Sequence, residues 1–234
     1  MREGIRLILE QTQYFGLVLS IGAYLFACWL KNKTKLAILN PLLVSAALII
    51  ACILGVGMDY ETYNKGASYL SWLLTPATVC LAIPLYKQLE LLRQHLIAVA
   101  SAIVAGVAGS VGSIYVMCRF FQLEHTHYVT LLPKSITTAI GMGVSEEAGG
   151  IVTLTVISII ITGILGNIIA DWLFQIFKIE EPIAKGLALG TAAHAIGTAK
   201  ALELGEIEGA MSSLSIAVAG LLTVVVVPLM SGLI

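Results

Sequence analysis

The chain has 234 residues, of which 58% are hydrophobic and 12% are charged, and its mean hydropathy is +0.95. A soluble domain of this length cannot bury so much apolar surface, so the composition excludes a soluble globular protein and indicates a membrane protein. The 13 Lys and Arg residues nearly balance the 14 Asp and Glu residues, and the absence of a basic patch excludes nucleic-acid binding. The four cysteines all fall within apolar runs, where a disulfide framework has no function.

Six long charge-free runs follow one another along the chain. Each is at or above the ~20 residues that a helix needs to cross the hydrocarbon core of a bilayer. Because the runs are continuous rather than alternating, they indicate helices. We therefore expect an all-α, polytopic membrane protein that forms a single transmembrane domain over residues 1–234. The expected spans are residues 11–30, 36–58, 66–86, 96–118, 148–170 and 209–234.

An internal repeat links three polar segments, residues 78–90, 135–147 and 191–203, at offsets of 57 and 56 residues. Each contains a Thr or Ser, then Ala-Ile followed by Pro or Gly, and then Glu. Each also leads into a long apolar run that carries a small residue before a glycine. These glycines are Gly106, Gly163 and Gly220. We interpret the pattern as an internal repeat of about 57 residues, and the alternative is that small residues recur in any helical membrane protein.

The last two polar segments are too short to cross a bilayer as ordinary helices. Their charge-free stretches, 135–145 and 186–199, have 11 and 14 residues, which correspond to about 16 and 21 Å of helix. Broken backbone is tolerated at membrane depth only where protein or water surrounds it. We expect broken or re-entrant segments at about 131–147 and 183–203, packed against each other near the membrane centre, where transporters bind substrates.

Both segments carry stripes of hydroxyl groups. Thr191, His194 and Thr198 share one helix face, as do Ser135 and Thr138. The predicted substrate-binding residues are Lys134, Ser135, Thr137, Thr138, Thr191, His194 and Thr198. The alternatives are that the lysine snorkels at a segment end, that the hydroxyls bond back to their own helices, and that the histidine makes an interhelical hydrogen bond.

His194 is also the predicted coupling or gating residue. With an ordinary pKa near ~6.5, it can arrive protonated with an anion and leave neutral, which would couple transport to protons. Glu147 is a second candidate for coupling or gating, although Glu146 and Glu147 fit an interfacial pair better than a catalytic one. We expect His194→Ala to abolish or strongly slow uptake and to flatten its pH dependence.

The motifs of common enzyme classes are absent from the sequence. There is no His-Glu-x-x-His motif, no Gly-x-Ser-x-Gly motif and no phosphate-binding glycine loop. The four histidines are scattered, and the His125-Thr126-His127 stretch is only a weak indication of a metal site. We expect a protein that is not an enzyme and that has no metal and no cofactor.

The stretches from Lys134 to Asn167 and from Glu181 to Thr223 resemble the LrgB/CidB family, most specifically in HAIGTA at residues 194–199. The resemblance implies a multi-pass protein of the bacterial inner membrane. Members of this family are described as murein hydrolase regulators or holin-like proteins. Plastid relatives carry glycolate and glycerate, and some bacterial members are associated with pyruvate.

Together, the resemblance and the broken segments favour a transporter for small monocarboxylates such as pyruvate, glycolate, glycerate or lactate. The alternative is a holin-like regulatory membrane protein that controls murein hydrolase activity and autolysis with a small LrgA/CidA-type partner. Long spans rich in small residues, such as residues 98–113, predict a homodimer or a larger oligomer.

Overall fold

The computed structural model describes residues 12, 14–34, 39–80 and 82–234. These residues form helices and turns, with no strand among them, which confirms the expected all-α class. By their internal contacts they divide into two compact units, residues 1–80 and 81–234. The single transmembrane domain expected over the whole chain stays a prediction.

The first unit contains short and medium-length helices. They are α2 (Phe15–Thr34), α3 (Pro41–Val56), α4 (Tyr60–Trp72) and α5 (Leu74–Cys80). α3 begins after Asn40, whose side chain accepts a hydrogen bond from the Leu42 N–H at 2.9 Å. It ends at Gly57, whose positive φ of 71° is typical of a helix C-cap. α2 and α4 meet where the Ser20 hydroxyl lies 2.8 Å from the Tyr63 hydroxyl.

Four helices in the described part of the chain are long and apolar enough to cross a membrane. They are α2 and, in the second unit, α8 (Leu96–Phe120), α11 (Val152–Ile176) and α13 (Glu206–Ser231). Many of their large apolar side chains are exposed, as expected for contact with lipid. These helices confirm the expectation of a polytopic helical membrane protein.

Two of the expected spans differ from the helices in the structure. The run 36–58 contains α3, whose 16 residues give about 24 Å of helix, and the start of this run lies outside the described residues. The run 66–86 covers the end of α4, all of α5 and most of α6 (Ala82–Lys87). α4 and α5 are separate helices that meet at Leu73, and residue 81, between α5 and α6, lies outside the described residues. Pro76 and Pro84 stand in the first turns of α5 and α6, where proline is tolerated, whereas proline inside a helix breaks it.

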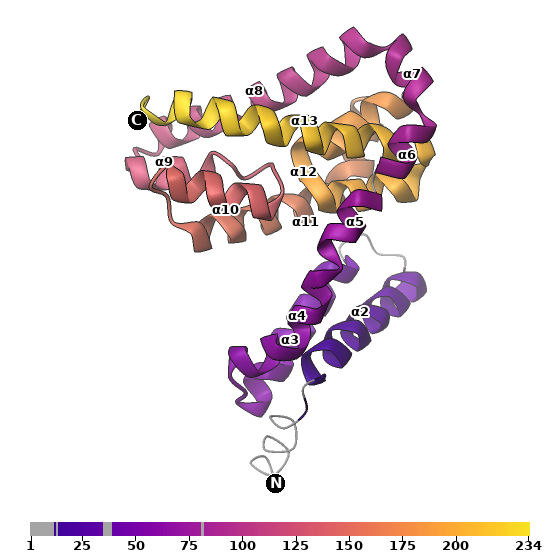
Figure 1. The fold of residues 1–234 in the computed structure, drawn as a ribbon, viewed down its shortest axis with the longest axis vertical. Coiled ribbons are helices and arrows are strands. Elements are labelled where there is room, and N and C mark those ends of the chain that lie inside the picture. Colours follow the sequence, from indigo (N-terminus) through magenta and orange to yellow (C-terminus); the bar gives the residue numbers. More distant parts are fainter. Residues whose placement is uncertain (1–11, 13, 35–38, 81) are drawn as a thin grey trace. The chain divides into compact units, whose positions relative to one another are not determined.

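The second unit is a bundle around three helices of similar length, α8, α11 and α13 (Figure 1). The shorter helices are α6, α7 (Leu89–Gln94), α9 (His125–Leu131), α10 (Thr138–Glu147) and α12 (Pro182–Leu204). α8 buries an apolar residue at every third or fourth position, which places one stripe in the core. This stripe consists of Val99, Ile103, Val107, Val111, Ile114 and Cys118, and it belongs to the same core cluster as residues of α13.

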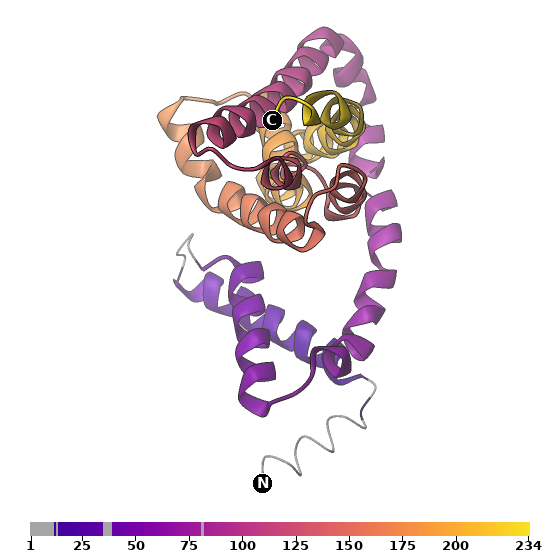
Figure 2. The same cartoon turned by 90° about the vertical axis from the view of Figure 1, so that its left-hand side faces the viewer.

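Contacts at the helix ends fix the directions of the long helices. The Tyr128 hydroxyl in α9 donates a hydrogen bond to the Met230 carbonyl at 3.0 Å, so α9 lies beside the last turns of α13. α8 ends shortly before α9 begins, so α8 and α13 end together at what we call the α9 end, which faces the viewer in Figure 2. At the opposite end, which we call the α12 end, Gly186 of α12 lies against the backbone of Glu208 in the first turn of α13.

α12 consists of two half-helices joined by a sharp break at His194. The backbone there has φ 41° and ψ −135°, outside the helical region and rare for a residue other than glycine. The chain reverses direction, because Gly197 lies against the carbonyl oxygen of Leu189, whereas a straight helix would separate them by about 12 Å. In the second half-helix, Leu202 packs on Gly209 near the start of α13. Both ends of α12 therefore lie at the α12 end of the unit.

The segment 131–147 has a related shape. α9 is followed by a turn at residues 132–137, and α10 begins at Thr138. Thr155 Oγ1, in the first turn of α11, lies 2.6 Å from Ser145 Oγ in α10 and 2.9 Å from the Thr130 carbonyl oxygen in α9. The last turns of α9 and α10 thus meet the same turn of α11. Thr138 and His194 are 56 residues apart, the offset of the expected repeat, and the repeat itself stays a prediction.

Candidate functional site

His194 is buried at the break of α12, with 3% of its surface exposed. Its Nε2 lies 2.9 Å from the backbone carbonyl oxygen of Ile159 in α11. Because a carbonyl oxygen only accepts, Nε2 must carry a hydrogen, and Nδ1 is the nitrogen left to accept a proton. Gly163 leaves room for the ring, since a methyl group in its place would lie 2.9 Å from Nε2. His194 therefore has the interhelical hydrogen bond that the sequence offered as the alternative to substrate contact.

The two threonines that share the His194 stripe form hydrogen bonds inside the protein. Thr198 Oγ1 lies 3.2 Å from the His194 carbonyl oxygen and 2.7 Å from Ser212 Oγ on α13. Thr191 Oγ1 donates to the Leu187 carbonyl one turn earlier, at 2.7 Å. The expected alternative of hydroxyls that bond back to their own helix therefore describes both side chains.

Lys134 and Ser135 lie in the turn between α9 and α10. Ser110 of α8 donates a hydrogen bond to Ser135 Oγ at 2.8 Å, and Lys134 Nζ donates to the same oxygen at 3.1 Å. Lys134 is half-buried, and none of the described carboxylates forms an ion pair with it. A cation that is partly removed from water without a counter-charge is costly, so this position favours an anion.

α8 brings the two broken segments together. Ser110 binds Ser135, and Gly106, one turn earlier on the same helix, touches Thr191. A methyl group at Gly106 would lie 2.9 Å from Thr191 Oγ1. Gly106 and Ser110 flank the middle of the 25-residue α8, so the two segments meet level with the centre of that helix. Ser135 and Thr191 are also equivalent positions in the expected repeat.

Ser110 and Gly106 of α8 thus link Lys134 and Ser135 of one segment to Thr191 of the other. The structure brings Lys134 and Ser135 close to Thr191, one turn before His194, and it adds Ser110, which no sequence pattern marked. The substrate-binding role of these residues stays a prediction. We call Ser110, Lys134, Ser135, Thr191 and His194 the midpoint cluster. It combines one lysine ammonium, one imidazole and three hydroxyls, which suits one small anion.

Thr137 and Thr138 begin α10 beside Lys134. Thr137 is the N-cap residue, but its side chain makes no capping hydrogen bond. Neither hydroxyl has a hydrogen-bond partner among the described residues, and both side chains are half-buried. The first N–H groups of a helix also lack partners within the helix and lie at its positive dipole end. The two hydroxyls and the first N–H groups of α10 are therefore available to bind a ligand.

Glu147 lies away from this cluster. It is exposed at the last residue of α10, about 14 Å along the helix from Thr138. Its coupling or gating role stays a prediction, and the structure does not place it near the other predicted site residues. Within the described ranges, no group of three His, Cys, Asp or Glu side chains is arranged to hold a metal ion.

A buried chain of hydroxyls beneath the turn at residues 132–137 was not predicted. Thr130, Ser145 and Thr155 are at most 1% exposed. Ser145 and Thr155 share a hydrogen bond, Thr155 reaches the Thr130 carbonyl, and the Thr130 hydroxyl accepts from the Ile151 N–H at 2.8 Å. This chain ties α9, α10 and α11 together. A Ser or Thr in an apolar run is a weak signal on its own, because most such hydroxyls bond to their own helix.

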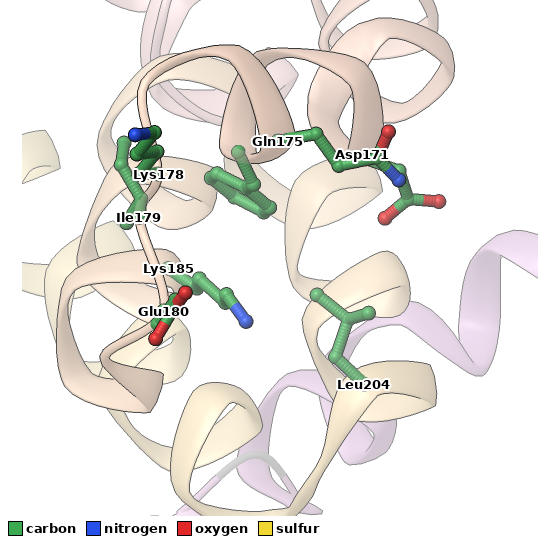
Figure 3. Close-up of a pocket in the computed structure, with 8 residues that line it drawn as sticks. Asp171, Gln175, Lys178, Ile179, Glu180, Lys185 and Leu204 are labelled. Atoms are coloured by element: carbon green, nitrogen blue, oxygen red, sulfur yellow. The ribbon is translucent and has the colours of Figure 1, made fainter.

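An ion pair joins the second half of α12 to α11. Lys200 Nζ lies 2.7 Å from an Asp171 carboxylate oxygen. Asp171 also lines an open cavity of about 490 Å³ at the α12 end. Figure 3 shows Lys185 extending into this cavity from α12, while Asp171 and Gln175 lie together on α11. The cavity is thus a polar recess at the outer ends of α11 and α12, away from the midpoint cluster.

A second cavity, of about 300 Å³, adjoins the midpoint cluster on the side of the α9 end. Its wall is almost entirely apolar, and Lys134 contributes its only charged side chain. We call it the Lys134 pocket. The residues that line it are Ser113, Ile114, Met117, Cys118, Phe121, Leu123, Leu131 and Lys134.

Comparison with known proteins identifies relatives over nearly the whole chain. The model of the LrgB-like family matches residues 20–233. Antiholin-like protein LrgB of Bacillus mycoides (strain KBAB4) is 38% identical over 219 residues, which is 93% of this chain and 95% of the relative. Antiholin-like protein LrgB of Bacillus subtilis (strain 168) is 37% identical over 216 residues, 92% of this chain and 94% of the relative. No solved structure matches.

These matches confirm the resemblance seen in the sequence. They cover both compact units and include every residue of the midpoint cluster. The family assignment agrees with the long apolar helices α2, α8, α11 and α13. The chain therefore belongs to the LrgB family and is a multi-pass helical protein of the bacterial inner membrane.

Proposed function

We propose that this chain is a holin-like regulatory membrane protein that restrains murein hydrolase activity and autolysis together with a small LrgA/CidA-type partner. The proposal rests on the match to relatives named antiholin-like, which extends over nearly the whole of both proteins. The match to the first relative covers 93% of this chain and 95% of the relative. No large part of such a relative lacks a counterpart here. The exposed apolar sides of the long helices offer surface for a membrane partner.

The regulatory proposal is tested in Bacillus subtilis from which the gene for the LrgB relative has been deleted. The chain is expressed there with and without the host's LrgA-type partner, and the rate of autolysis after exposure to a cell-wall antibiotic is measured. We expect slower autolysis only when both proteins are present. An unchanged rate, with the chain detected in the membrane, would exclude this function.

A second candidate function is supported by the midpoint cluster, namely carriage of small monocarboxylates. In this proposal the two broken segments are re-entrant, α9 and α10 entering the bilayer from one side and α12 from the other. Their inner ends would meet near the membrane centre, since both contact the middle of α8. Broken helices at that depth are the usual setting of substrate sites in transporters.

The residues of the cluster have separate tasks in this mechanism. A carboxylate at the membrane centre needs donors and a counter-charge, because an unpaired charge is expensive there. Lys134 supplies the charge, and Thr137, Thr138 and the first N–H groups of α10 donate hydrogen bonds. His194 keeps Nε2–H on the Ile159 carbonyl, so that a coupled proton would bind at Nδ1. Thr191 and Thr198 hold the two half-helices of α12 in place.

Carriage is tested by uptake of radiolabelled pyruvate, lactate, glycolate and glycerate into proteoliposomes. We expect saturable uptake of at least one acid, which Lys134→Gln abolishes and an inward proton gradient stimulates. Arg119→Gln is a matched control, because Arg119 is an exposed cation at the end of α8 and outside the cluster. Uptake that is absent with every acid would exclude the carrier function and leave the regulatory function as the better proposal.

A further inference from the structure

The Lys134 pocket differs from an ordinary polar substrate site. Its wall includes Ile114 and Cys118 in the buried face of α8, and Leu131 at the end of α9. The hydroxyl of Ser113 also lines it, but this hydroxyl already donates to the Ser110 carbonyl at 2.7 Å. Apart from the weakly hydrogen-bonding thiol of Cys118, the pocket therefore offers one cation at Lys134 and no free hydrogen-bonding group along its wall among the described residues.

The depth of Lys134 restricts what occupies the pocket. Its ammonium shares Ser135 Oγ with Ser110, which stands ten residues before the end of α8, about 15 Å along the helix. Half of the hydrocarbon core is also about 15 Å thick. A phospholipid keeps its head group at the membrane surface, so its phosphate would not reach this ammonium. A small free acid has no such restriction.

We propose that the Lys134 pocket selects monocarboxylates with a compact apolar tail. This inference rests on the carrier function and names its substrate class. The carboxylate pairs with Lys134 and Ser135, and the tail lies against Ile114, Met117 and Leu131. The pocket volume of about 300 Å³ holds roughly ten water-sized groups, which accommodates a tail of about three to eight carbons.

The same geometry disfavours other acids. A dicarboxylate would place its second charge against an apolar wall, where no described cation faces it. The hydroxyls of glycerate would lose their hydrogen bonds to water without replacement. Each methylene added to an alkyl tail is removed from water, so it strengthens binding about fourfold.

The test is calorimetric titration of the full chain in lipid nanodiscs with butyrate, hexanoate, glycerate, pyruvate and succinate. Empty nanodiscs correct for partition of the acids into lipid. We expect hexanoate to bind about 15-fold more tightly than butyrate, glycerate to bind more weakly than butyrate, and succinate not to bind. Lys134→Gln abolishes binding of every acid.

A pair of substitutions on α8 isolates the pocket. Met117→Trp fills it from the exposed side, and Val116→Trp places the same ring on the neighbouring residue, which is exposed but does not line the pocket. We expect Met117→Trp to remove the advantage of hexanoate over butyrate and Val116→Trp to keep it. Equal effects of the two variants would overturn the inference.

The outcomes separate this inference from the carrier function. Binding of glycerate as tight as that of hexanoate would overturn the pocket's selectivity while leaving the carrier function intact. Absence of binding by all five acids would overturn both. Binding restricted to long-chain fatty acids or anionic phospholipid added to the nanodiscs would make the pocket a lipid site and overturn the inference.

Discussion

The two broken segments have the same overall plan but differ in how their polar groups are used. In α12, His194, Thr191 and Thr198 all bond to neighbouring backbone or side chains. In the turn before α10, Lys134 has no described counter-charge, and Thr137 and Thr138 have no described hydrogen-bond partner. α12 is therefore held in place by internal hydrogen bonds, and we call it the braced segment, whereas the α9–α10 segment presents groups to a ligand.

Among the changes in the braced segment, replacing His194 should lower the free energy of unfolding the most. His194→Ala leaves the Ile159 carbonyl without its partner and creates a cavity, which costs about 2–4 kcal/mol of unfolding free energy. His194→Gly loses the same contacts, but glycine adopts the positive φ without strain, so this variant should be about 1–3 kcal/mol more stable than His194→Ala. Denaturant unfolding in detergent measures both. Equal stabilities would mean that the break is not strained.

A larger side chain at Gly163 of α11 tests the contact between α11 and the break of α12. A side chain there meets His194 and Ile196 below 3 Å, so Gly163→Val costs about 1–3 kcal/mol and displaces the imidazole. Gly109→Val is the matched control, because Gly109 lies in the long helix α8 with open space around it. Thermal unfolding compares the variants. A Gly163→Val protein as stable as the control would contradict the close contact between α11 and the break of α12.

The buried hydroxyl chain of Thr130, Ser145 and Thr155 should contribute less to the free energy of unfolding than the contacts of His194 do. Thr155→Val removes the hydroxyl that Ser145 and the Thr130 carbonyl share, at a cost of about 1–2 kcal/mol. Thr155→Ser keeps that hydroxyl and serves as the control. We also expect Thr155→Val to weaken carboxylate binding by moving Lys134, while Thr155→Ser preserves it. Titration in nanodiscs tests this, and unchanged binding by the valine variant would show that the chain does not position the turn.

The Lys200–Asp171 ion pair at the α12 end should contribute the least to the stability of the protein. Asp171 is 52% exposed, so its pair with Lys200 contributes at most about 1 kcal/mol. Lys200→Gln should therefore lower the unfolding temperature by only a few degrees in low salt and by less in high salt. A loss of stability as large as that caused by His194→Ala would show that Lys200 contributes as much as His194 to holding α12 in place.

Hydropathy predicted the long helices α8, α11 and α13, because each is a continuous apolar run. The side of such a helix that packs in the core and the side that contacts lipid both consist of apolar residues, so the run has no polar interruptions. Hydropathy did not predict the boundary between α4 and α5 at Leu73 within the run 66–86, although Pro76 just after it carried that signal. Charge-free length set the two short segments apart, and their re-entry into the bilayer stays a prediction. The position of the α12 break, at His194 itself, was not predicted, because neighbouring glycines were stronger local signals than a histidine with positive φ.

The substrate-binding role of the site residues stays a prediction. The sequence placed Thr191, His194 and Thr198 on one helix face, but the helix breaks at His194. Their internal partners Ile159 and Ser212 lie on other helices and carry no mark in the sequence. Ser110 was missed for the same reason, since only the folded bundle places it beside Ser135. Contacts between distant helices depend on packing, and local patterns do not encode them.

We expect the two broken segments to enter the membrane from opposite sides, and cysteine labelling distinguishes the two sides. Single cysteines replace the exposed residues Ala184, Leu202, Glu124 and Glu146 in a chain without its four native cysteines. A membrane-impermeant maleimide is then applied to right-side-out and inside-out vesicles. Positions 184 and 202 should react from one side, and positions 124 and 146 from the other. Labelling of 184 and 202 from opposite sides would make α12 a continuous span and overturn this arrangement.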